Sequence, residues 1–352
     1  MNRSNAPIFV VGANRSGTTL VRLMLNAHPR IAIPEELNYF KRVGTSTPWH
    51  RPGWTDAAYA RFAEGTLSHF APLLPNLPVD AARERLLGAA SPTYRTPYAT
   101  LLEMWAAQEG KARWGEKTPG NLFFVDQLIE MFPDAQFIYV ARDPRAGVAS
   151  MQRVSFFPDD VIFNALNRRK SWNVGYQLLE RIVPKAQRIA IRYEDLVRAP
   201  RDMAETLCTF LDESYAPAML RFHTDAEHYM KTEAANSFNE AATRPISTAR
   251  IDTWKDKLTP TEVGWVESLC ADEMQAFAYQ PTHPQRSLRA RITQHIKSAY
   301  WHYDVWRHRY YRPYIVRHVP GQSLRNKLRD WSKWLQSRCD PLHDIASGEG
   351  VR

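Results

Sequence analysis

The chain has 352 residues, 44% apolar and 24% charged, which is ordinary for a globular protein large enough to bury a substantial core. No apolar run approaches the roughly 20 residues that a membrane-spanning helix needs, and the N-terminus lacks the pattern of a secretory signal peptide. The three cysteines, Cys208, Cys270 and Cys339, are far apart and give neither a disulfide framework nor a zinc site, so we expect a reducing, cytoplasmic setting.

The net charge of +9 is concentrated near the C-terminal end of the sequence. Residues 286–338 contain thirteen Lys or Arg against two Asp, a net charge of +11, so the remainder carries −2. Because the positive charge lies in the tail and the core is near neutral, we expect a partner that recognises this charge to bind the tail.

The N-terminal stretch predicts a buried strand, a tight glycine loop and an amphipathic helix. Residues 8–11 form a continuous apolar run, and Leu20, Met24 and Leu25 recur at helical spacing after the loop. In such a loop the backbone N–H groups and the positive end of the helix converge, so we expect it to bind an anion.

The loop nearly has the spacing of a nucleotide-binding P-loop, with Gly12 and Gly17 separated by four residues. Thr18 stands where that motif has lysine, whereas Arg15 places a cation inside the loop, which argues against NTP hydrolysis. The run Arg15-Ser16-Gly17-Thr18 resembles the 5′-phosphosulfate loop of sulfotransferases that use PAPS (3′-phosphoadenosine 5′-phosphosulfate). The resemblance implies that a set of loop residues holds this group: Asn14, Arg15, Ser16, Gly17, Thr18 and Thr19. The alternative is a strand-turn-helix corner with a chance glycine pair.

Two carboxylates, Glu35 and Glu36, follow the short apolar run at residues 31–33. A carboxylate beside an anion site is disfavoured unless it acts as a base on the acceptor hydroxyl. Tyrosylprotein sulfotransferases and similar bacterial enzymes have a Glu-Glu pair here, and this resemblance assigns the catalytic base to Glu36. The alternative is a solvated pair that caps a helix.

Residues 41–110 are rich in Pro, Trp and Ala, with helical patterns at 56–70 and 97–108. An insertion at this point of such a fold usually covers the active site, so we expect a helical lid that selects the acceptor. The aromatic residues Trp49, Trp54, Phe62 and Tyr94 could stack on a sugar or a phenol, or form the core of the lid.

Lys117 follows an ordered stretch that begins at Trp114 and precedes a helix. A lysine at a strand end can reach an anion near the first loop. Family resemblance assigns the lysine of this Glu-Lys-Thr-Pro pattern to the sulfuryl group, where it offsets charge on the bridging oxygen. A surface lysine is the alternative, and we expect Glu116 to cap or pair rather than to catalyse.

A second strand-helix corner lies at residues 136–151, where Asp143-Pro144 opens a helix after Arg142. Ser150 lies eight residues after Arg142. The pair resembles the family's 3′-phosphate site, and a guanidinium suits that site because it can donate two hydrogen bonds to one phosphate.

Two further contacts follow from the same resemblance. Residues 188–196 look like a third strand that ends in an Arg-Tyr-Glu-Asp-Leu pattern, which places Tyr193 near the nucleotide, although a structural role is equally compatible. Residues 243–255 resemble a loop that closes over the nucleotide and precedes a helix over 260–278. There Arg250 is a second candidate for the 3′-phosphate, and Trp254 a packing or adenine contact.

Strands alternating with helices predict an α/β fold, a three-layer P-loop type with a central parallel sheet between helices and a mostly helical C-terminal extension. Ligands in such folds bind beyond the carboxyl ends of the strands, where all these motifs lie. We expect a sulfotransferase domain over residues 1–282, which includes the lid, and a basic, aromatic-rich extension over 283–352.

The extension interleaves basic residues with Trp and Tyr. This composition fits an anionic membrane surface, or a lipid-linked or acidic glycan acceptor. No nucleic-acid recognition module accompanies the charge. A solvated helix docked on the core is the alternative.

The sequence therefore predicts a sulfotransferase that moves a sulfuryl group from PAPS to a hydroxyl, releases PAP (adenosine 3′,5′-bisphosphate) and needs no metal. Its predicted catalytic residues are Glu36, Lys117 and Arg15. A carbohydrate or glycolipid acceptor is favoured, protein or peptide tyrosine is the alternative, and the oligomeric state is open. Two hypotheses come from other functional classes. One is a P-loop kinase or NTPase, and the other is an inactive nucleotide-binding adaptor.

Overall fold

The computed structural model describes residues 5–43, 55–90, 92–154, 157–224, 244–282 and 287–306. Trp49, Trp54, Cys339 and the tail beyond residue 306 lie outside the described residues. The chain divides into two compact units, the first formed by residues 1–142 and 170–251 and the second by residues 143–169 and 252–352.

The first unit is built on a five-stranded sheet of order β2-β3-β1-β4-β5 in which all neighbouring strands are parallel. The strands are β1 (Ile8–Gly12), β2 (Ile31–Ala32), β3 (Arg113–Lys117), β4 (Gln136–Ala141) and β5 (Arg188–Arg192). The α/β fold with a central parallel sheet that the alternating pattern predicts is confirmed.

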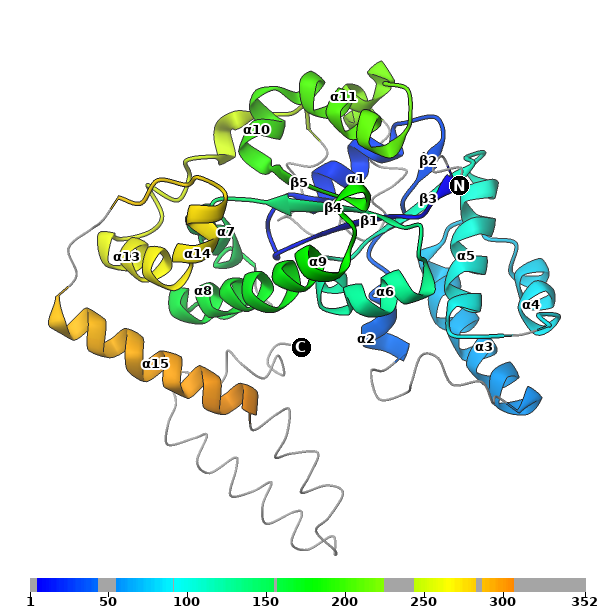
Figure 1. Ribbon diagram of the computed structural model, residues 1–352, viewed down its shortest axis with the longest axis horizontal. Helices are drawn as coiled ribbons and strands as arrows, with labels where there is room; N and C mark the ends of the chain where they lie inside the picture. The colour runs from blue at the N-terminus through cyan, green and yellow to red at the C-terminus, as the bar shows by residue number, and fades with distance from the viewer. Residues whose placement is uncertain are drawn as a thin grey trace, which may run out of the picture. The chain divides into compact units, whose positions relative to one another are not determined.

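Helices cover both faces of this sheet, with α10 and α11 on one side and α6 and α9 on the other (Figure 1). The helices of this unit are α1 (Thr18–Asn26), α2 (Tyr39–Val43), α3 (Asp56–Phe70), α4 (Val79–Leu87), α5 (Arg95–Gln108), α6 (Val125–Met131), α9 (Gln177–Ile182), α10 (Tyr193–Arg198) and α11 (Pro200–Leu211). Shorter helical segments are η2 (Ala71–Leu73), η3 (Pro119–Phe124), η4 (Ser171–Tyr176), η5 (Lys185–Gln187), η6 (Pro217–Thr224) and η8 (Thr248–Arg250).

Alternating side chains of β1 supply the cores of the two faces, as expected of a strand buried on both sides. Ile8 and Val10 belong to an aliphatic cluster that includes side chains of α1 and α11. Phe9 lies in an aromatic cluster on the other face, with its ring centroid 5.4 Å from Phe137 and 6.0 Å from Trp114.

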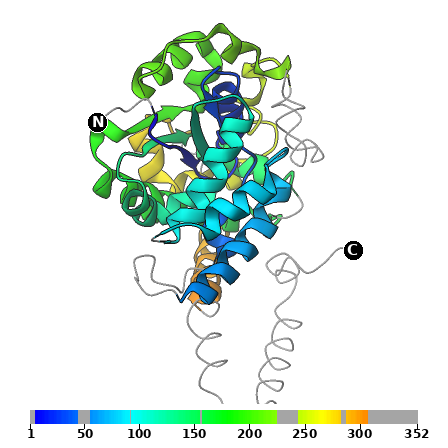
Figure 2. The ribbon, with the colours of Figure 1, turned by 90° about the vertical axis from the view of Figure 1, so that its right-hand side faces the viewer.

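Helices α3, α4 and α5 pack on one another within residues 56–108, and Figure 2 shows α3 and α5 side by side. The two helices predicted here are confirmed, and α3 has the predicted bounds. The role of residues 41–110 as an acceptor lid stays a prediction.

The second unit contains α7 (Pro144–Met151), α8 (Val161–Lys170), α13 (Pro260–Leu269), α14 (Ala271–Ala276) and α15 (Leu288–Trp306). The single helix predicted over 260–278 is wrong, because the chain leaves helical geometry at Cys270, whose buried thiol lies 3.6 Å from the carbonyl of Ala165. The predicted domain boundary at residue 282 stays a prediction.

Two buried arginines of this unit make three ion pairs. Arg145 contacts Glu267 at 2.7 Å and Asp143 at 2.7 Å, and Arg168 contacts Glu273 at 2.7 Å. Removing one partner of such a pair leaves an uncompensated buried charge, so these arginines have structural roles.

Within the described ranges, no helix has the length and apolar character required to span a bilayer.

Candidate active site

The glycine loop joins β1 to α1 and turns through two residues with positive φ. Arg15 has a φ of 65° and Gly17 a φ of 96°, and Gly17 is the N-cap of α1. A Cβ on Gly17 would lie 2.5 Å from the Tyr193 ring, so glycine is required by both backbone geometry and space. The N-terminus of α1 therefore opens directly into the loop, as an anion site requires.

The remaining loop residues differ in exposure. Asn14 is exposed, Arg15 and Thr19 are half-buried, and Ser16 and Thr18 are buried. Thr18, which stands where a P-loop lysine would be, begins α1.

Lys117 lies at the end of β3, next to β1, and its side chain is fully buried. Its ammonium lies 2.6 Å from a carboxylate oxygen of Glu36 and 3.3 Å from the Thr19 hydroxyl. The alternative of a surface lysine is therefore wrong. The Lys117 ammonium therefore contacts both the predicted anion loop, through Thr19, and Glu36, the predicted base.

Glu36 follows β2, and its side chain is 36% exposed. A substrate hydroxyl can therefore approach Glu36 from solvent, while Lys117 lies behind it. Glu35 is also half-buried and has interaction partners of its own.

Arg142 directly follows β4 and contacts three other residues that the sequence singles out. Its guanidinium lies 4.4 Å from the centroid of the Tyr193 ring and donates to the carbonyls of Arg15 at 3.0 Å and Arg250 at 2.9 Å. The first unit thus gathers the loop, Arg142, Tyr193 and Arg250 at the carboxyl ends of β1, β4 and β5.

Ser150 and Trp254 belong to the second unit, so their relation to this cluster stays a prediction. Ser150 lies on α7. Trp254 is buried in the core of its unit, and the Arg145 guanidinium lies 4.2 Å from the centroid of its ring.

Glu116 is more deeply buried than the sequence indicates. It is fully buried on β3, beside Lys117, and its carboxylate accepts hydrogen bonds from the Thr118 hydroxyl and the Asn121 amide. Burial, which outweighs these hydrogen bonds, raises the pKa of Glu116 to about 7. The Glu-Lys-Thr-Pro pattern contained these residues but gave no sign that the carboxylate is buried.

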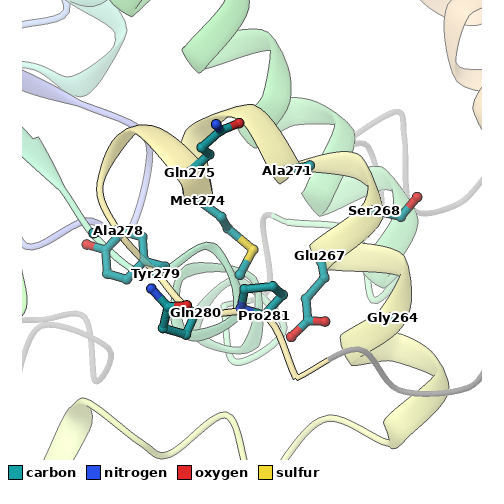
Figure 3. A pocket seen from close by; sticks show the side chains of 10 residues that line it. All are labelled: Gly264, Glu267, Ser268, Ala271, Met274, Gln275, Ala278, Tyr279, Gln280 and Pro281. Carbon is teal, nitrogen blue, oxygen red and sulfur yellow. The ribbon is translucent and has the colours of Figure 1, made fainter.

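A pocket of about 790 Å³ lies in the second unit, lined by α13, α14 and the residues that follow (Figure 3). None of the predicted site residues lines it. The carboxylate of Glu267, which lines the pocket, accepts hydrogen bonds from Arg145 and from Thr282, the latter at 2.8 Å. The charge of Glu267 is therefore already compensated within the protein.

The part of the chain that the structure describes contains no group of three or more His, Cys, Asp or Glu residues that could hold a metal ion.

The chain is similar in sequence to protein-tyrosine sulfotransferases. The chain is 26% identical over 226 residues to a protein-tyrosine sulfotransferase of Drosophila melanogaster, covering 62% of this chain and 40% of that protein. It is 25% identical over 289 residues to protein-tyrosine sulfotransferase 1 of Danio rerio, covering 80% and 74%. The chain thus spans 40% of the first relative and 53% of a related chicken (Gallus gallus) protein.

Solved structures show the same fold. The sulfotransferase domain of the olefin synthase from Synechococcus PCC 7002 matches with a TM-score of 0.56 and 24% identity, covering 78% of this chain and 95% of that domain. A family model described as "Sulfotransferase family" matches residues 7–217, a segment that contains the loop, Glu36, Lys117, Arg142 and Tyr193. The chain therefore belongs to the sulfotransferase family.

Proposed function

We propose that this protein transfers a sulfuryl group from PAPS to a hydroxyl group of an acceptor and releases PAP. The observation that carries the proposal is the position of Lys117, whose ammonium contacts both Glu36 and Thr19 of the anion loop. This reaction requires a base, a cation and an anion loop. Here the cation lies within hydrogen-bonding distance of both the base and the loop.

Each residue has a defined part in the proposed reaction. Glu36 takes the proton from the acceptor hydroxyl, whose oxygen forms the new bond to sulfur. The bond between sulfur and the bridging oxygen breaks, and its electron pair stays with the 5′-phosphate of PAP. Lys117 and the loop, including Arg15, stabilise the negative charge that develops on that oxygen.

The 3′-phosphate is assigned to Arg142, with Arg250 as a further contact, and the part of Ser150 stays a prediction. Support comes from the position of Arg142, which lies against Tyr193 and the loop backbone. In the structure its two terminal nitrogens are bound to backbone carbonyls, so a phosphate contact would replace or share these hydrogen bonds.

The acceptor is proposed to be a carbohydrate or glycolipid, and protein tyrosine is the second candidate because the relatives above are protein-tyrosine sulfotransferases. The test is incubation of the purified chain with ³⁵S-labelled PAPS and a lysate of its source organism, followed by separation of lipid, glycan and protein fractions. Label in the lipid or glycan fraction is expected. Label only on protein tyrosine selects the second candidate, whereas no transfer and no PAP binding overturn the proposal.

Helix α15 supports a more specific partner, an anionic membrane surface. Four of its apolar residues, at a spacing that places them on one face, are 50% to 71% exposed: Leu288, Ile292, Ile296 and Tyr303. The opposite face is buried through Ala290 and Trp301. Exposed Arg289 and Arg291 flank the apolar face, and this combination fits a helix lying on anionic lipid.

The test is co-sedimentation with phosphatidylcholine vesicles, with and without phosphatidylserine. The wild-type chain is expected to bind the anionic vesicles only, and the double variant Ile292→Ser/Ile296→Ser to lose this binding. Leu87→Ser, at an exposed leucine of α4, is the matched control and is expected to bind normally. Equal binding by the double variant would remove the membrane from the proposal.

A further inference from the structure

The buried carboxylate of Glu116 connects β3 to the segment that carries Glu36. It accepts hydrogen bonds from two donors, the Thr118 hydroxyl and the Asn121 amide. Through Thr118 this network reaches the backbone that follows the proposed base.

The Thr118 hydroxyl makes this connection. It donates to Glu116 and accepts from the backbone N–H of Asn38 at 3.2 Å, although 80 residues separate Asn38 from Thr118 in the chain. Asn38 has a φ of 54°, so the chain turns sharply two residues after Glu36. Through Thr118, Glu116 thus holds the backbone N–H of Asn38, two residues after the proposed base.

Lys117 holds the other end of Glu36, because its ammonium lies 2.6 Å from the carboxylate. Neighbouring residues of one strand thus fix the side chain of Glu36 and the backbone after it. We propose that Glu116 is a positioning residue, which through Thr118 holds the Asn38 backbone so that the Glu36 carboxylate stays on Lys117 and faces the acceptor hydroxyl. The inference rests on the proposed function, since it needs Glu36 as base.

A purely local role for Glu116 would not account for these contacts. Capping of η3 needs only the hydrogen bonds to Thr118 and Asn121. The hydrogen bond from Asn38 to Thr118 crosses from the end of β3 to the segment after β2, and it acts on the backbone that determines where Glu36 points. Placement of a catalytic group to within a fraction of an ångström affects turnover more than it affects nucleotide binding.

The test is a double-mutant cycle between Glu116 and Glu36. Glu116→Gln keeps the size of the side chain but replaces one accepting oxygen by an amide nitrogen, so at least one donor loses its acceptor. The initial rate of ³⁵S transfer from PAPS to the lysate fraction that the wild-type chain labels is expected to fall by about tenfold, the scale of a small loss of alignment. PAP affinity is expected to stay within about twofold, since the loop is intact. In a Glu36→Gln background the same substitution is expected to change the residual rate by less than about twofold, because its effect passes through Glu36.

An equal loss in both backgrounds, or a parallel loss of PAP affinity, would overturn the positioning role. A wild-type chain that neither binds PAP nor transfers ³⁵S would instead overturn the proposed function itself, before any variant is compared. The two failures are therefore distinguishable.

Thr118 provides a matched pair of variants should Glu116→Gln fold poorly. Thr118→Ser keeps the bridging hydroxyl and is expected to transfer at a rate within about threefold of wild type. Thr118→Val keeps the volume but removes the hydroxyl, and it is expected to lose about tenfold in rate at nearly unchanged PAP affinity. Equal rates for the two variants would show that the hydroxyl bridge does not position the base, and would overturn the inference.

Discussion

The Lys117 ammonium lies 2.6 Å from a carboxylate oxygen of Glu36, although 81 residues separate the two in the chain. The pair is asymmetric, because Lys117 is fully buried whereas the Glu36 side chain is 36% exposed. The cation thus faces the anion loop, through Thr19, and the carboxylate faces solvent. The three groups thus lie in the order that the proposed reaction needs. The loop holds the phosphosulfate, Lys117 lies where negative charge develops, and Glu36 meets the acceptor hydroxyl.

Gly17→Ala is expected to weaken nucleotide binding. The substitution places a Cβ at a φ of 96° and 2.5 Å from the Tyr193 ring, so either the loop or Tyr193 must move. We expect PAP affinity, measured by titration calorimetry, to fall by at least tenfold and the free energy of unfolding by about 1–3 kcal/mol.

Gly65→Ala is the matched control for this prediction. Gly65 lies within α3 and a Cβ there meets nothing within 4 Å, so the variant is expected to bind PAP normally and to gain about 0.5–1 kcal/mol in stability. Normal PAP binding by Gly17→Ala would show that the loop is not the anion site.

Arg142→Ala is expected to weaken PAP more than adenosine 5′-monophosphate. Loss of charge-assisted hydrogen bonds to the 3′-phosphate costs about 1.5–3 kcal/mol, or about tenfold to a hundredfold in PAP affinity. Adenosine 5′-monophosphate lacks that phosphate and is expected to lose less than about threefold, an effect of the lost contacts with the loop carbonyl. Equal losses for the two nucleotides would show that Arg142 supports the loop and does not contact the 3′-phosphate.

Arg142→Lys separates charge from geometry. It keeps the cation but cannot donate to one phosphate through a planar fork, so we expect a PAP affinity between those of wild type and Arg142→Ala.

Glu116 makes the stability of the protein depend on pH. Burial raises its pKa from an ordinary 4.5 to about 7. Between about pH 4.5 and pH 7, Glu116 is therefore protonated in the folded state and ionised in the unfolded state. The stabilisation is complete below about pH 4.5 and is lost as the pH rises through about 7, with a magnitude of about 3 kcal/mol.

The measurement is the free energy of unfolding in urea at pH 5 and pH 8, for the wild-type chain and Glu116→Gln. The wild-type chain is expected to lose more stability than the variant between the two pH values, since Gln does not titrate. Parallel behaviour of the two proteins would contradict the raised pKa. Charged and titratable groups near Glu116, namely Glu36, Lys117 and Tyr98, are common to both proteins.

Much of the fold could be predicted from the sequence, because the buried strands β1 and β4 are continuous apolar runs and each is followed by a loop or helix signal. The same holds for α3, whose N-cap Thr55 accepts from the backbone N–H of Ala58. The break between α13 and α14 could not be predicted, because it occurs where Cys270 is buried against Ala165, a contact with no local signal.

The candidate site was predictable in its residues but not in its connections. Resemblance could name Glu36 and Lys117, yet their ion pair depends on the parallel pairing of β3 with β1 and β2, which brings the two segments together. Glu116 was expected to cap or pair. Its connection through Thr118 to the Asn38 backbone lies outside any sequence pattern, since a backbone N–H has no side-chain identity to read.

The most direct test of the account compares Glu36→Gln with Glu35→Gln. Gln at position 36 keeps an oxygen that can accept from Lys117 but cannot take a proton from the acceptor. Glu36→Gln is expected to lower the rate of ³⁵S transfer from PAPS by about a hundredfold or more with PAP affinity within about twofold, whereas Glu35→Gln stays within about threefold in both. A Glu36→Gln variant that transfers sulfate at the wild-type rate would contradict the assignment of the base and, with it, the central claim.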